Sequence, residues 1–286
     1  MRKFLAALLT LCLALTLVAP IAMAEEKVTI TFAFWDTNQE PGMKAIAEAY
    51  MAEHPNVTVE TQVTPWSEYW TKLEAAAQGG ALPDVFWMHS NQFFKYVSAG
   101  MLLDLTDKDV FSTIDEGMLK DTLYEGKSYI LPISMNAAGV FYNKKIFEEN
   151  GIEVPTTYEE LIAVCEKLKA AGITPFVMHN MDWQASTVWS MVALNCVDDY
   201  ETVNSAIYNG EATVTDYAGF EESAQEFLEL NSYAQEDTMG TNYDQALDAF
   251  ANGEAAMIIQ GIWIVPSVKA LNPDLQFSSF PLPAKT

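Results

Sequence analysis

The sequence has little positive charge. It carries 15 Lys and Arg against 39 Asp and Glu, so its formal net charge at pH 7 is −24. Proteins that bind nucleic acid displace counterions with clustered basic side chains, which this composition does not supply. We therefore expect no nucleic-acid partner and a soluble, self-repelling acidic surface.

Motifs of nucleophilic catalysis and of metal binding are also missing. The sequence contains no G-x-S-x-G and no C-x-x-C, and its three histidines, His54, His89 and His179, do not have the spacing of metal ligands. The tripeptide GKS at 126–128 resembles the end of a nucleotide-binding loop, but Asp121 stands where that motif requires a glycine. We therefore predict no enzymatic activity, no metal and no organic cofactor.

The first 24 residues are typical of a cleaved export signal. Arg2 and Lys3 precede an apolar run over 4–18, and residues 22–24 form the small-x-small pattern of a cleavage site. Removing the two basic residues would lower the net charge from −24 by two, to −26. We expect an exported protein, located in the periplasm or at the extracellular cell surface.

Two cysteines remain after that cleavage, Cys165 and Cys196, each inside an apolar helical pattern. Buried free thiols fit this placement best. An exported compartment also permits a disulfide, so that alternative stays open.

Strand patterns and helix patterns alternate along the first part of the chain. Residues 27–35 and 57–63 alternate polar with apolar side chains, whereas 42–53 has the apolar spacing of a helix. A second helical stripe over 65–80 ends at a glycine pair and precedes a short apolar run at 85–88. This alternation predicts a parallel, doubly wound sheet.

Helix patterns dominate the second part of the chain. A hairpin turn is predicted at 125–126 and a strand at 139–143, and Thr156 with Glu159 suggests the capping box of a helix. Further helices are predicted near 186–196, 219–232, 243–252 and 262–271, and further strands at 255–260 and 276–280. A boundary near 132–138 would then separate two α/β lobes.

Aromatic and amide side chains gather at the predicted carboxyl ends of the strands, where ligands bind in open α/β sheets. A sugar offers apolar C–H faces that stack on indoles, and hydroxyls that pair with carboxylates and amides. These segments hold Trp35, Asp36, Asn38, Trp87, His89, Asn91, Asn136, Asp182, Trp183, Gln260 and Trp263. Their chemistry favours a sugar-binding site.

Several of these residues also have a purely structural interpretation. Trp66 and Trp70, on the helical stripe, are assigned to the core, and Trp263 is either core filler or a ligand platform. Gly261 would let a ligand or the backbone come close. Asp36 could instead cap the helix that follows it.

Two other functions stay open from the residues alone. A polyamine receptor would use Asp36 and Asp182 beside aromatic rings. A secreted glycan-acting enzyme would need two facing carboxyl groups, one with a raised pKa, and the spacing of the acidic residues identifies no such pair.

Six segments of the sequence, taken in order, form a wider pattern. They are EAYMAEHPNVTVE, YWTKLEAAAQGGALPDVFWMHSNQFFKYVSAGMLLDLT, YEGKSYILPISMNAAGVFYNKKIFEENGI, VPTTYEELIAVCEKLKAAG, FANGEAAMIIQGIW and FPLP. Together they resemble the extracellular solute-binding proteins of family 1, the sugar receptors of ABC importers. The resemblance covers residues 27–283 and implies an α/β, two-lobe periplasmic-binding-protein-like fold with a ligand cleft between the lobes.

The resemblance also implies lobes over 25–134 and 135–286, and a monomer that binds a carbohydrate and meets ABC permease subunits at the membrane. The resemblance implies that the ligand is bound by Trp35, Asp36, Asn38, Trp87, His89, Asn91, Asn136, Asp182, Trp183 and Trp263. Maltose-binding members have acidic residues where this chain has Ser90 and Asn136, so maltose is not implied. Family members usually continue past FPLP, and we therefore expect a truncated chain whose first lobe lacks its returning segment.

Overall fold

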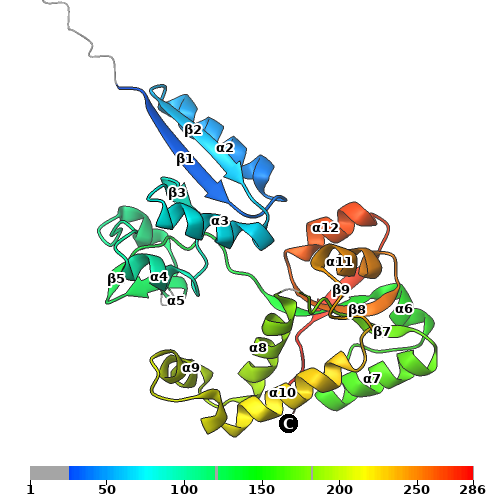
Figure 1. Ribbon diagram of the computed structural model, residues 1–286. Coiled ribbons are helices and arrows are strands. Elements are labelled where there is room, and N and C mark those ends of the chain that lie inside the picture. Colours follow the sequence, from blue (N-terminus) through cyan, green and yellow to red (C-terminus); the bar gives the residue numbers. More distant parts are fainter. Residues whose placement is uncertain (1–25, 120–121, 182, 286) are drawn as a thin grey trace, which may run out of the picture. The chain divides into compact units, whose positions relative to one another are not determined.

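The computed structural model describes residues 26–119, 122–181 and 183–285 (Figure 1). The predicted signal peptide and Asp182 lie outside the described residues. The chain forms two compact units, which we call unit 1, ending at Pro132, and unit 2, over Ile133–Thr286. The sequence places the lobe boundary two residues later, between residues 134 and 135.

Unit 1 contains a three-stranded parallel sheet. Its strands are β1 (Val28–Phe34), β2 (Val57–Val63) and β3 (Val85–Phe86), in the order β2-β1-β3. Helices α2 (Glu40–Glu53) and α3 (Trp66–Gln78) connect them. The alternating strands and helices predicted for this region are confirmed.

The three strands of unit 1 point the same way, so their carboxyl ends meet at one edge of the sheet. Beyond the last paired residues, the Trp87 N–H donates to the Ala33 carbonyl at 2.9 Å. The Thr64 N–H donates to the Phe34 carbonyl at 3.0 Å. The segments that follow the three strands therefore leave from the same edge.

The rest of unit 1 consists of short elements. They are α4 (Phe93–Ser98), the 3-10 helix η1 (Asp109–Thr113), α5 (Glu116–Leu119) and the strands β4 (Leu123–Tyr124) and β5 (Lys127–Ser128). β4 and β5 form the predicted antiparallel hairpin, and positive φ at Glu125 (51°) and Gly126 (78°) gives its turn the twist that such hairpins favour. Lys127 pairs there with Asp104 at 2.8 Å.

Unit 2 is built on a four-stranded mixed sheet of order β7-β8-β6-β9. Its strands are β6 (Ala138–Asn143), β7 (Thr174–Val177), β8 (Ala255–Gly261) and β9 (Phe277–Phe280). β7 and β8 run parallel, whereas β6 is antiparallel to both β8 and β9. Every residue of the interior strand β8 is buried.

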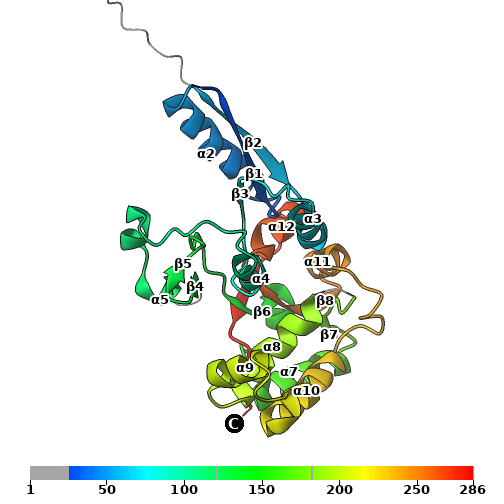
Figure 2. The same cartoon turned by 60° about the vertical axis from the view of Figure 1, so that its left-hand side comes forward.

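Helices cover both faces of this sheet. They are α6 (Lys144–Glu149), α7 (Tyr158–Ala170), α8 (Gln184–Cys196), α9 (Tyr200–Tyr208), α10 (Ala218–Asn231), α11 (Tyr243–Ala251) and α12 (Ile264–Leu271), with a 3-10 turn η3 (Val214–Asp216). Helices α8 and α10 lie side by side (Figure 1, Figure 2). None of the described helices combines the length and the apolar character needed to cross a membrane.

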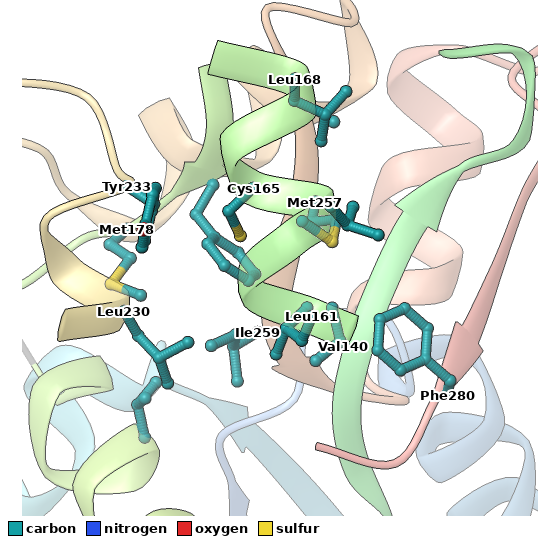
Figure 3. Packing of buried hydrophobic residues seen from close by; sticks show 14 of the residues in the cluster. Val140, Leu161, Cys165, Leu168, Met178, Leu230, Tyr233, Met257, Ile259 and Phe280 are labelled. Atoms are coloured by element: carbon teal, nitrogen blue, oxygen red, sulfur yellow. The ribbon is translucent and has the colours of Figure 1, made fainter. Parts of the chain in front are cut away.

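The core of unit 2 follows from the alternation of side chains along β8. Met257 and Ile259 point to one face, where they pack with Leu161 of α7 (Figure 3). Ile258 points to the other face and packs with Phe250 of α11. Such two-sided burial requires a continuous apolar strand, as the sequence shows at this position.

The capping box of α7 lies one residue later than the sequence predicted. Thr157, not Thr156, is the N-cap, and its Oγ1 accepts a hydrogen bond from Glu160 N at 3.2 Å. The Glu160 carboxylate in turn accepts from the N–H groups of Thr156 and Thr157. The helix itself begins at Tyr158, whose side chain is buried.

Both cysteines are free thiols. Cys165 is buried in the face of α7 that packs against the sheet, and its burial raises its pKa to about 12. Cys196 is half-buried at the end of α8, and desolvation together with the acidic Glu226 raises its pKa to about 11. Both thiols are therefore protonated at neutral pH and poor nucleophiles.

Candidate functional site

The carboxyl edge of the unit 1 sheet carries a cluster of six rings, which we call the Trp35 cluster. Trp35 is its centre, and its ring centroid lies between 5.0 and 5.7 Å from those of four other residues. The six members are Trp35, Trp66, Tyr69, Trp70, Trp87 and His89. Most of the contacts are edge-to-face, the geometry that aromatic quadrupoles favour.

The topology of unit 1 explains why these rings meet. Trp35 follows β1 and Trp87 follows β3, while Trp66 opens the helix α3 that comes after β2. The Tyr69 hydroxyl donates to the Trp87 carbonyl at 2.8 Å and fixes α3 to the end of β3. Burial of that phenol raises the pKa of Tyr69 above its ordinary value.

Trp66 is a member that the sequence interpretation assigned to the core. It is half-buried, and its ring lies against Trp35 (5.2 Å) and His89 (5.8 Å). His89 is exposed, but desolvation of its imidazole lowers the pKa of His89 below its ordinary value. The helical stripe correctly predicted which side of α3 carries Trp66. It did not predict that Trp66, the first residue of the helix, reaches the edge of the sheet.

The polar residues predicted for unit 1 lie in the loops beside this cluster. Asp36 accepts hydrogen bonds from Asn38 N at 2.9 Å and Gln39 Nε2 at 2.8 Å, so it stabilises the loop before α2 without capping that helix directly. Asn38 and Asn91 are exposed, and Asn91 N approaches His89 Nδ1 at 3.4 Å. Both side chains lie at the surface of unit 1.

The corresponding sheet edge of unit 2 carries a second cluster, which we call the Trp263 cluster. Its members are His179, Trp183, Tyr243 and Trp263. Trp183 contacts the other three rings at centroid distances of 5.2 Å to His179, 5.7 Å to Tyr243 and 5.9 Å to Trp263. Trp183 and Trp263 are half-buried, so each keeps a solvent-accessible surface.

Strand directions bring the predicted residues of unit 2 to this edge. β7 and β8 are parallel and end there, while the antiparallel β6 begins there with Ala138 opposite Gly261. Asn136 is exposed just before β6, and the neighbouring Ala137 carbonyl accepts from Ile262 N at 2.9 Å. Asn136, Trp183 and Trp263 therefore leave the sheet at one edge.

Buried polar side chains connect members of the Trp263 cluster. The Trp263 indole Nε1–H donates to Gln260 Oε1 at 3.1 Å, and Gln260 Nε2 lies 2.6 Å from His179 Nε2. Gln184 donates from Nε2 to the Ile259 carbonyl at 2.8 Å and accepts from the His179 backbone N–H. Gln184, His179 and Gln260 are all at least 99% buried.

The room above Gly261 is taken by the Trp263 ring itself. A Cβ at Gly261 would lie 1.9 Å from Cζ3 of Trp263, well inside van der Waals contact. The expectation that Gly261 gives room to a ligand or to the backbone is therefore corrected. The glycine lets the indole of Trp263 fold back over the strand end.

Sequence reasoning named Gln260 at the end of its strand but missed His179 and Tyr243, and it did not predict the pairing of Gln260 with His179. Gln260 and His179 are 81 residues apart, and no local pattern pairs them. Within residues 26–119, 122–181 and 183–285, no three His, Cys, Asp or Glu side chains gather in a way that could hold a metal ion. The chemistry of both clusters is that of stacking surfaces with hydrogen-bonding groups around them.

A family model described as bacterial extracellular solute-binding protein matches residues 36–286. The chain belongs to this family. This solute-binding protein is 25% identical over 269 residues to the multiple sugar-binding protein of Streptococcus mutans. The alignment covers 91% of this chain and 63% of that relative, so the chain spans less than two thirds of its length.

Two solved structures show the same fold. One comes from work on xylan utilisation by Caldanaerobius polysaccharolyticus, with 27% identity and a TM-score of 0.78 over 89% of this chain and 68% of that one. The other is a chitin oligosaccharide binding protein, with 25% identity and a TM-score of 0.76 over 89% of this chain and 67% of that one. The α/β fold of two-lobe solute-binding proteins, expected from the sequence, is thereby confirmed.

Proposed function

We propose that this solute-binding protein is the extracytoplasmic substrate-binding subunit of an ABC importer that takes up a sugar or an oligosaccharide. The observation that carries the proposal is the Trp263 cluster, where two half-buried indoles stand at the carboxyl ends of strands with a buried amide behind them. Open α/β sheets bind ligands at such ends. The names of the sugar-binding and chitin-oligosaccharide-binding relatives support the same ligand class.

The chemistry of both clusters suits a carbohydrate. Indole faces stack on the apolar C–H faces of a sugar ring, and amide or carboxylate groups bind its hydroxyls. In this proposal the ligand contacts Trp35, Asp36, Asn38, Trp87, His89, Asn91, Asn136, Asp182, Trp183 and Trp263, and Trp66 and Tyr243 join them as parts of the same clusters.

Binding in this account leaves the sugar chemically unchanged. Ligand binding would stabilise one conformation of the protein, which a membrane permease then recognises. The protein acts outside the cytoplasm as a monomer after removal of its signal peptide. No cofactor takes part.

A polyamine is the second candidate ligand. Trp35 and its neighbouring rings offer aromatic faces to a cation, and the half-buried Asp36 follows Trp35 directly. The acidic composition would attract such a ligand from solution.

Thermal unfolding with a panel of ligands tests this proposal. We expect the melting temperature to rise with at least one series of xylo-, chito-, malto- or galacto-oligosaccharides, without products when the same mixtures are analysed by chromatography. A shift with spermidine alone would replace the sugar by a polyamine. Formation of shorter sugars would contradict a binding-only function and make the chain an enzyme.

A further inference from the structure

The hydrogen bonds around Gln260 fix the orientation of its amide. The indole N–H of Trp263 can only donate, so the group that faces it at 3.1 Å must be the Oε1 acceptor of Gln260. The amide Nε2 then points to the opposite side, where it lies 2.6 Å from His179 Nε2. An amide NH₂ can only donate, so His179 Nε2 must accept.

This pairing determines the protonation state of His179. An imidazole nitrogen accepts a hydrogen bond only when it carries no proton, and a neutral imidazole then carries its proton on the other nitrogen. His179 is therefore neutral, with its proton on Nδ1. The other protonated forms would place two donors against each other between His179 and Gln260.

Both members of the pair are anchored from behind. Gln184, completely buried at the start of α8, accepts from the His179 backbone N–H and donates to the Ile259 carbonyl. It thereby holds the segment after β7 against β8. Gln260, which binds the indole, therefore lies among buried neighbours that are themselves hydrogen-bonded.

We propose that Gln260 and His179 are positioning residues, which hold the Trp263 indole in one orientation before a ligand arrives, with His179 neutral and protonated on Nδ1. The consequence for binding rests on the proposed function. A stacking ring that already faces the right way does not have to lose rotational freedom when the ligand binds. Gln260 and His179 thus contribute to affinity without touching the ligand.

Unit 2 contains a matched control for this proposal. Trp189 of α8 also donates its indole N–H, to Ser223 Oγ at 2.8 Å. The Ser223 hydroxyl in turn donates a hydrogen bond to the Phe220 carbonyl at 2.9 Å, within α10. This second indole bond lies between two helices and involves no residue of the Trp263 cluster.

The protonation state of His179 is measured directly by long-range ¹H–¹⁵N correlation spectra of the ligand-free protein at neutral pH. We expect the ¹⁵N shifts of a neutral ring with a protonated Nδ1 and a bare Nε2. A ring protonated on Nε2, or on both nitrogens, would overturn the assignment.

Two substitutions of Gln260 test the positioning role. In Gln260→Met the indole loses its acceptor. The Trp263 Nε1–H signal, which is assigned through Trp263→Phe, should therefore lose its protection from hydrogen exchange. Sugar affinity should fall about five- to tenfold. In Gln260→Glu an ionised carboxylate can still accept from the indole with one oxygen, while its second oxygen can also only accept and therefore needs a proton on His179 Nε2. This variant should keep the protected indole signal and most of the affinity, with His179 now protonated on Nε2.

The control and the contrary outcomes are distinct. Ser223→Ala should move only the Trp189 indole signal and leave sugar affinity unchanged. If Gln260→Met leaves the Trp263 signal unaltered, or if Gln260→Glu loses it as Gln260→Met does, the positioning role is contradicted. Should Gln260→Met fail to fold, the His179 spectrum and the Gln260→Glu variant still decide. If the indole behaves as expected but no sugar binds any variant, the proposed function fails while the positioning of Trp263 stands.

Discussion

The Trp35 cluster and the Trp263 cluster occupy the same place in their sheets but are held in different ways. Trp35 is surrounded by rings, and the Nε1 of its neighbour Trp70 is buried without a hydrogen-bond partner among the described residues. The indole of Trp263 instead donates into a buried chain of Gln260 and His179. Aromatic rings can pack against each other in several relative orientations, whereas a hydrogen bond fixes one orientation.

The comparison separates two ways of making an aromatic surface for a ligand. In unit 1 the rings are also the core, because Trp35 and Trp70 pack against the buried Tyr69 and Leu73. Changes there should disturb folding and binding together. In unit 2 Trp263 also packs against the core around Ile258, but among the described residues its ring contacts one other aromatic ring, Trp183, whereas Trp35 contacts four. Loss of Trp263 should therefore disturb folding less than loss of Trp35.

The largest effect is expected for Trp35→Ala. Removing the centre of the Trp35 cluster should lower the free energy of unfolding of unit 1 by about 3 kcal/mol, at the lower end of the range for Trp→Ala in a core because Trp35 is half-buried. Urea unfolding followed by near-UV circular dichroism measures the change. Leu103→Ala, at a side chain 73% exposed in the same unit, is the control and should have little effect. A loss below about 1 kcal/mol for Trp35→Ala would mean that the rings do not hold unit 1 together.

Gly261→Ala should have the next largest effect and act on the Trp263 cluster. The new methyl group would overlap the ring of Trp263, which must move away and lose its bond to Gln260. We expect a loss of about 1–3 kcal/mol in stability from overpacking, and weaker sugar binding measured by calorimetry. Gly42→Ala, where a Cβ meets nothing within 4 Å, is the control. Unchanged sugar affinity in Gly261→Ala would show that the position of the indole does not matter.

Thr157→Ala should destabilise unit 2 by about 1 kcal/mol, the usual cost of a lost N-cap. The Thr157 hydroxyl accepts a hydrogen bond from Glu160 N, whereas the Thr156 hydroxyl donates one to the Glu160 side chain. Thr156→Ala should therefore cost less, and chemical denaturation of the two variants compares them. Equal losses would argue against the one-residue shift of the capping box.

The smallest effect concerns the acid stability of unit 1. Asp84 accepts from both N and Oγ1 of Thr31 at 2.8 Å, and these hydrogen bonds lower the pKa of Asp84 below its model-compound value of 3.8. A lowered pKa in the folded state stabilises the protein above pH 3.8, and this contribution is lost as the pH falls through the lowered value. Between pH 5 and pH 2, the free energy of unfolding should therefore fall more steeply with decreasing pH in the wild type than in Asp84→Asn. Identical pH profiles would show that the hydrogen bonds of Asp84 do not contribute to the acid stability of unit 1.

Much of the fold could be predicted because its elements have strong local periodicity. The strand at 57–63 was predicted with the bounds that β2 has, and the late strand and the hairpin were placed within one or two residues. Helix α9 was missed because it starts after Asp199, a residue with φ of 48° and no side-chain cap, so the usual start signal is absent.

The candidate site was predictable only in part. The rule that ligands bind beyond strand ends found Trp35, Trp183 and Trp263, which the structure places in the two clusters. The rule named Gln260 but could not find His179 or the pairing of the two, since that pairing depends on strand order and on two buried side chains far apart in sequence.

The role of Trp263 in sugar binding is tested most directly by calorimetric sugar binding to Trp263→Ala, with Trp189→Ala as the matched tryptophan control. We expect Trp263→Ala to lose less stability than Trp35→Ala and to bind the stabilising oligosaccharide about 1–3 kcal/mol more weakly, the range of a lost stacking face. Trp189→Ala should bind with wild-type affinity per folded molecule. If Trp263→Ala instead unfolds while its folded fraction binds sugar as the wild type does, Trp263 is a core residue and the central claim is wrong.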